Sequence, residues 1–120
     1  MSGANFSYFM ESLETLENLL HAETQAIAAQ HLDTIDSIMV QKDESLRIVT
    51  EAKQMLTSDP RLNDVANQQI NYVLKLQAKN ADSFKRLKDK VKMRSSNDQI
   101  KDSFASKKLK SAYTNDTQNY

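Results

Sequence analysis

Cysteine and tryptophan are absent from this sequence, and glycine and proline occur only once each among its 120 residues. Without cysteine the chain can form neither a disulfide framework nor a thiolate metal site, and a reducing compartment fits this composition. Glycine and proline mark turns and interrupt helices, so their near absence favours long, uninterrupted helices. The composition therefore predicts an all-α protein.

Long hydrophobic runs are missing as well. No apolar stretch approaches the ~18 residues of a membrane span, and the N-terminus has neither the basic region nor the apolar core of a secretion signal. Charged residues account for 27% of the chain and hydrophobic residues for 39%. This is lean for a compact core, but it suits long helices that each bury a single stripe. We therefore expect one domain with no membrane span.

The net charge is zero, but the two parts of the chain carry opposite charge. Residues 1–44 contain eight acidic residues and one basic residue, Lys42, a net charge of −7. The remaining residues contain 15 basic and eight acidic residues, a net charge of +7. Acids near the start of the first helix and bases near the end of the last would favour the helix dipoles. A basic surface that faces a partner is the alternative interpretation.

Seven residues of the N-terminal region recur at alternating spacings of three and four, which is the spacing of a buried helical stripe. They are Phe6, Phe9, Leu13, Leu16, Leu20, Glu23 and Ile27, and a second set repeats the spacing with Ile35, Met39, Lys42, Leu46 and Val49. Each set has one charged member, and a carboxylate on an apolar stripe is costly unless it is paired. If the chain reverses near residues 31–32, Lys42 lies about one residue, or ~1.5 Å, from the level of Glu23. The pattern predicts a helical hairpin with a Glu23–Lys42 ion pair.

Three long helices and one weak helix are predicted along the chain. They cover residues 6–30, 33–56 and 60–94, and then 98–110. Asp33 is a good cap for the second helix. Asp59 is expected to cap the third, with Pro60 in its first position.

The expected fold is therefore an antiparallel bundle of three long helices with a weakly ordered C-terminal tail helix. The bundle is assigned to residues 1–94, and residues 95–120 form a flexible or client-dependent tail. Three such helices close a small core only partly, because a helix stripe needs partners on both sides. We expect either self-association into a homo-oligomer or an open groove that receives another helix.

Residue types that carry catalysis or bind cofactors are scarce. His21 and His31 are the only histidines and lie ten residues apart, which is not a two-histidine metal spacing on one helix face. Neither is followed by the Lys-Gly pair that is usual after the phosphorylated residue of histidine phosphotransfer bundles. Glu23 and Lys42 could form an acid/base pair, but fixing the register of two helices is the simpler role. We expect no enzymatic activity, no cofactor and no metal.

A basic run near the end of the third predicted helix has two interpretations. Its members are Lys85, Arg86, Lys88, Lys90, Lys92 and Arg94. Such a run could bind nucleic acid. However, it is interleaved with Leu87 and Val91, and no aromatic residue accompanies it after Phe84. Together with the zero net charge, this favours a solvated helix end and no nucleic-acid partner.

The predicted hairpin resembles a known family. The residues that carry the resemblance are Leu16, Leu20, Glu23, Ala26 and Ile27, then His31, Leu32, Asp33, Ile35 and Ile38, then Lys42, Asp43, Glu44 and Leu46. This pattern is similar to the first helical hairpin of FlgN-type flagellar export chaperones. Leu74, Gln77 and Asn80 resemble the polar-punctuated third helix of the same family. The resemblance covers about residues 10–90 and departs at Gln30, since the family commonly has glycine at this turn. The related FliT-type chaperones share the length and layout.

The resemblance implies a cytoplasmic chaperone of flagellar type III secretion. Such a chaperone binds the C-terminal helix of hook–filament junction proteins and delivers them to the export gate. We expect the client groove along the third helix and the tail, lined by Leu76, Ala81, Phe84, Leu87, Val91, Ile100 and Phe104. Tyr113 is a candidate gate-docking residue by analogy. The alternatives are a self-associating structural adapter and a FliT-type chaperone of the filament cap.

Overall fold

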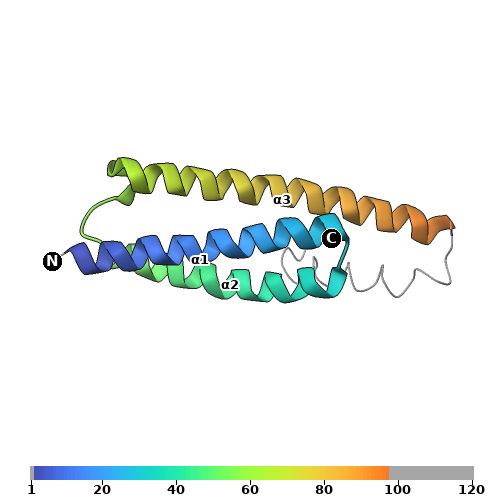
Figure 1. The fold of residues 1–120 in the computed structure, drawn as a ribbon, viewed down its shortest axis with the longest axis horizontal. Helices are drawn as coiled ribbons and strands as arrows, with labels where there is room; N and C mark the ends of the chain where they lie inside the picture. The colour runs from blue at the N-terminus through green and yellow to red at the C-terminus, as the bar shows by residue number, and fades with distance from the viewer. Residues whose placement is uncertain (1, 98–120) are drawn as a thin grey trace.

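Three long helices make up the computed structural model, which describes residues 2–97 (Figure 1). They are α1 (Ser2–Ala29), α2 (Leu32–Gln54) and α3 (Asp64–Asn97), with a one-turn 3₁₀ helix, η1 (Pro60–Leu62), before α3. No strand occurs within residues 2–97, so the predicted all-α bundle of three long helices is confirmed. The predicted tail helix over 98–110 lies outside the described residues. None of the described helices combines the length and apolarity needed to cross a bilayer.

α1 lies at the centre of the array and contacts both other helices (Figure 1). Glu23 of α1 meets Lys42 of α2, so these two helices run antiparallel. α1 and α3 run parallel to each other. Leu20 of α1 is hydrogen-bonded to Asn80 of α3, and Glu17, nearer the N-terminus of α1, is hydrogen-bonded to Gln69, nearer the N-terminus of α3. The backbones of α2 and α3 lie further from each other than either lies from α1. The side of the bundle between α2 and α3 is therefore its less closed side.

The core follows α1 along its length in three clusters. Near its N-terminus Phe9 and Leu13 pack against Ala52 of α2, and at mid-length Leu16 and Leu20 pack against Val73 of α3. The largest cluster lies near the turn and contains Ala26, Ile27, Ile35, Ile38, Phe84, Leu87 and Val91. Full burial of each large apolar side chain contributes roughly 1.5–3 kcal/mol. The predicted stripe of α1 is thus its buried face, from Phe9 to Ile27.

The turn between α1 and α2 is made without glycine. Gln30 adopts φ 59°, in the left-handed region. The N–H of Gln30 donates to the carbonyl of Ile27, and that of His31 to the carbonyl of Ala26, both at 3.0 Å. This is the Schellman arrangement that commonly ends a helix. α2 then begins one residue before the predicted cap Asp33, which lies in its first turn, where its charge favours the helix dipole.

The connection between α2 and α3 differs from its prediction. Asp59 does act as a cap, but of η1, whose first residue is Pro60. Asn63 then adopts an extended backbone, and its Oδ1 accepts a hydrogen bond from the N–H of Ala66 at 3.0 Å. The long helix therefore begins at Asp64, and the predicted start at residue 60 was too early. The reason is local, because asparagine is as strong an N-cap as aspartate. Asn63, four residues after Asp59, acts as a second N-cap and starts a new helix.

Candidate helix-binding groove

A groove runs between α2 and α3, whose backbones lie further from each other than either does from α1. Its larger section has a volume of about 440 Å³. The lining comes from α1 (Phe9, Leu13, Leu16, Leu20), α2 (Leu46, Val49, Lys53), the connection (residues 59–61) and α3 (Ile70, Val73, Leu74, Gln77). A smaller section of about 190 Å³ lies toward the turn, next to Met39, Ala81 and Phe84. Leu46 and Gln77 line both sections, so the two sections adjoin.

The groove walls carry large apolar side chains that are partly exposed. Leu46 of α2 is 47% exposed and Leu74 of α3 is 55% exposed. Along α2 the groove extends from Met39 to Lys53, which is about 21 Å, or four helical turns, at 1.5 Å per residue. These dimensions suit a short helix laid against the floor that α1 provides.

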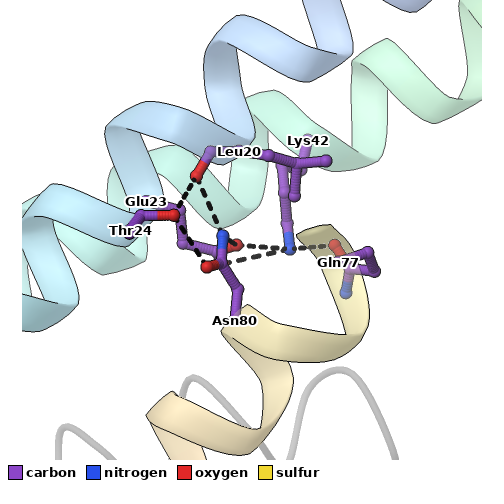
Figure 2. Close-up of polar contacts among 6 residues, drawn as sticks. All are labelled: Leu20, Glu23, Thr24, Lys42, Gln77 and Asn80. Atoms are coloured by element: carbon purple, nitrogen blue, oxygen red, sulfur yellow. Dashed lines mark hydrogen bonds and ion pairs between the residues drawn. The ribbon is translucent and has the colours of Figure 1, made fainter. Parts of the chain in front are cut away.

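Near the middle of the groove lies a cluster of polar contacts that joins the three helices (Figure 2). The Nζ atom of Lys42 lies 3.1 and 3.0 Å from the two carboxylate oxygens of Glu23. The same ammonium donates to Oε1 of Gln77 at 3.0 Å. Glu23 is only 2% exposed and Lys42 8%. A single ammonium thus connects side chains from all three helices.

Asn80 completes this cluster from α3 (Figure 2). Its Nδ2 donates to the backbone carbonyl of Leu20 at 2.8 Å and to Oε1 of Glu23 at 3.0 Å. The hydroxyl of Thr24 lies 2.7 Å from Oδ1 of Asn80 and 2.9 Å from the Leu20 carbonyl, and can donate its single proton to either. Asn80 is 2% exposed, and both ends of its amide have hydrogen-bond partners inside the protein.

The cluster satisfies the condition under which buried charges are tolerated. Among the described residues, every buried side-chain nitrogen or oxygen has a hydrogen-bond partner. Removing one member would leave another charged or polar group buried without its partner, which is far costlier than replacing a whole pair. The cluster therefore fixes the heights of α1, α2 and α3 relative to one another.

The predicted Glu23–Lys42 ion pair is confirmed. Its other partners were missed, although the sequence contained a signal. Gln77 and Asn80 interrupt the apolar positions of α3 three residues apart, and such polar interruptions in a buried stripe are expected to have partners. The pattern does not show which helix supplies those partners, because residues distant in sequence must first be placed side by side.

The residues predicted to line a client groove occupy different environments. Phe84 is 1% exposed and, with Leu87 and Val91, belongs to the core cluster at the turn. Leu76 packs at the edge of the mid-bundle cluster. Ala81 and Phe84 border the smaller groove section. Ile100, Phe104 and Tyr113 lie outside the described residues.

The larger groove section lies further toward the N-terminus of α3 than expected, at Ile70, Val73 and Leu74. The reason is that the apolar residues in the C-terminal half of α3 find partners inside the chain, at the end of the α1–α2 hairpin. A client-binding role for the predicted residues stays a prediction.

The histidines lie apart from the groove. Nε2 of His21 is 3.1 Å from a carboxylate oxygen of Glu17, and the ring lies beside Tyr72 on the outer surface of α1 and α3. His31 is exposed at the turn and its side chain forms no capping hydrogen bond. Within residues 2–97 no group of three or more His, Asp or Glu side chains is placed to hold a metal ion.

Charged residues on the outer faces of α2 and α3 pair locally. Arg47 forms ion pairs with Glu44 and Glu51 on α2, and its hydrogen bond lowers the pKa of Glu44. In the basic run, Arg86 pairs with Asp82 one turn earlier. These are exposed pairs within single helices, which contribute little to stability.

Comparisons with protein-family models, with curated proteins and with solved structures each find no match to this chain.

Proposed function

We propose that this protein binds an amphipathic helix of a partner in the groove between α2 and α3. The observation that carries the proposal is the apolar groove itself, with the side chains of Leu46 and Leu74 half exposed on its opposite walls. Large apolar side chains grouped around a concave surface favour a protein or ligand that covers them. Exposed leucines scattered singly over a surface would not indicate a binding site, because such residues are common on protein surfaces.

The shape of the groove favours a helix as the occupant. α1 contacts both neighbours, while a four-turn groove runs between α2 and α3 and is crossed at its middle by the Lys42–Gln77 hydrogen bond. One further helix in that channel would complete a four-helix bundle around a shared core. In helix-in-groove binding of this kind, the bound helix contacts the groove through apolar residues at spacings of three and four.

The resemblance of the hairpin to FlgN-type proteins supports a more specific role. On that basis we propose an export chaperone of flagellar type III secretion that works in the cytoplasm. Its client would be the C-terminal helix of a hook–filament junction protein, delivered to the export gate with Tyr113 as the proposed docking residue. We place the main client contacts at Leu46 and Leu74, with Ala81 and Phe84 at the smaller section. Leu87 and Val91 would support α3 from the core.

Calorimetric titration with two peptides tests the proposal. The first peptide is the C-terminal helical segment of a hook–filament junction protein from the same organism, and the second is the corresponding segment of the filament cap protein. Saturable binding of the junction segment alone is expected. Binding of the cap segment alone would instead favour a FliT-type role.

Two matched variants connect binding to the groove. Leu74→Asp places a charge on the groove wall and is expected to weaken binding at least tenfold. Val65→Asp makes the same kind of change at an exposed apolar position of α3 that lines neither groove section, and should leave binding unchanged.

Sedimentation measurements address the adapter alternative. If neither peptide binds and the full chain self-associates until Leu74→Asp makes it monomeric, the groove is a contact between copies of this chain. That result would overturn the chaperone proposal.

A further inference from the structure

Gln77 is the one side chain in the polar cluster that also lines both sections of the groove. The orientation of its amide is fixed by chemistry. An ammonium can only donate, so the atom 3.0 Å from Nζ of Lys42 must be the amide oxygen. The Nε2 group of Gln77 is therefore the other end of the amide, and it makes no hydrogen bond to any residue within 2–97.

A helix bound in the groove would have to cover this N–H group. Gln77 is exposed, so its Nε2 is free to bond to water when the groove is open. An apolar side chain laid over it would remove that water and leave a donor unpaired, which opposes binding. A side chain with an accepting oxygen at the same level would replace the lost hydrogen bond.

We propose that the groove selects helices whose apolar stripe carries one hydrogen-bond acceptor, such as glutamine, at the level of Gln77. This inference rests on the proposed function and adds the chemistry of the partner and the register in which it binds. A single polar position in an apolar interface fixes register in the same way in coiled coils, since every shifted alignment leaves polar groups unpaired.

The extent of the groove on either side of Gln77 also predicts where the hydrogen-bond acceptor lies along the bound helix. The larger section reaches Ile70, seven residues before Gln77, and the smaller section reaches Phe84, seven residues after it. Seven residues correspond to about two turns, or ~10 Å. The acceptor therefore falls at the centre of a stripe with about two turns of apolar residues on either side.

A set of synthetic helices tests the inference with the full-length protein. Each is an amphipathic peptide of about 18 residues, long enough for the four-turn groove, with leucines at spacings of three and four. The central stripe position is glutamine, methionine or lysine. Methionine has a similar shape without polar atoms, and lysine can donate but cannot accept. The glutamine peptide is expected to bind about tenfold tighter than the other two, measured by calorimetry.

Two substitutions of Gln77 should change this preference in different ways. Gln77→Met removes the N–H group, so the glutamine peptide is expected to lose its advantage. Gln77→Glu retains an acceptor for Lys42 but offers an accepting oxygen to the groove, so the preference is expected to move to the lysine peptide. Gln68→Met changes an exposed glutamine of α3 outside the groove and should leave the wild-type preference intact.

The outcomes separate this inference from the proposed function. Equal binding of all three peptides by the wild-type protein, or a preference that survives Gln77→Met, would overturn the inference and leave helix binding standing. The inference also fails if the junction-protein segment binds and no designed peptide does. If no helix binds at all, both proposals fail together. Thermal melts of each variant confirm that a changed preference does not come from unfolding.

Discussion

Asn80 of α3 donates a hydrogen bond from Nδ2 to the backbone carbonyl of Leu20, an interior residue of α1, at 2.8 Å. Because a helix carbonyl already accepts a bond from its own helix, this contact uses its second lone pair. The bond therefore joins the side chain of one helix to the main chain of another, whichever side chain occupies position 20. It holds α3 against α1 at a defined height.

Replacement of Asn80 is expected to destabilise the protein more than its size suggests. In Asn80→Leu, the buried Glu23 carboxylate would lose one partner, and the Leu20 carbonyl and the part-buried Thr24 hydroxyl would each lose one as well, so we expect a loss of about 2–4 kcal/mol. Urea denaturation measures this loss. The control Asn18→Leu changes an exposed asparagine of α1 and should shift stability by less than about 0.5 kcal/mol. Equal losses in the two variants would show that the Asn80 bonds contribute nothing.

The ion pair between Glu23 and Lys42 should behave as a coupled unit. Glu23→Gln or Lys42→Met alone is expected to cost about 1–4 kcal/mol, because each leaves a buried group without its partner. The double variant should cost less than the sum of the single losses. A double-mutant cycle from thermal or urea melts gives the coupling directly, and strictly additive losses would contradict the pairing.

The left-handed residue at the first turn offers a stabilising substitution. Gln30→Gly removes the side-chain strain of φ 59°, at the cost of a more flexible unfolded chain. We expect a net gain of about 0.5–1 kcal/mol in the free energy of unfolding. Gln25→Gly, at an exposed position inside α1, should instead lose about 1 kcal/mol. Destabilisation by both glycines would mean that the turn is not strained.

Two apolar positions of α3, one on the groove wall and one in the core, should respond differently to truncation of their side chains. Phe84→Ala removes a ring from the core cluster and is expected to cost about 3–5 kcal/mol. Leu74→Ala removes a half-exposed side chain from the groove wall and should cost less than about 1 kcal/mol, while it weakens helix binding. Comparable losses of stability would indicate that Leu74 belongs to the core and that the groove is closed in solution.

Much of the fold follows from spacing alone, because a helix buries whichever face carries the apolar residues. The stripe of α1, the turn before α2 and the meeting of Glu23 with Lys42 all follow from counting residues along one hairpin. The position of the groove did not follow in this way. An apolar stripe shows which face of a helix is buried, but not whether a neighbour in the same chain or a partner buries it.

α3 shows why that distinction matters. Its C-terminal half packs at the end of the hairpin, and its middle borders the groove, although both carry apolar residues at the same spacing. The nine residues 55–63 that connect α2 and α3 impose little constraint on where α3 docks. Its height is set by Gln77 and Asn80, whose partners are 35 or more residues away in sequence.

The central place of α1 also has a consequence for how the chain folds. The α1–α2 hairpin is joined by a tight turn and brings together residues close in sequence, so its loop closure costs the least entropy. During synthesis this hairpin leaves the ribosome before α3. We expect pulse-labelled hydrogen exchange to show protection of α1 and α2 amides before those of α3. Until α3 docks, the carbonyl of Leu20 would bond to water on one side, and the hairpin would expose on that side the stripe that α3 later covers.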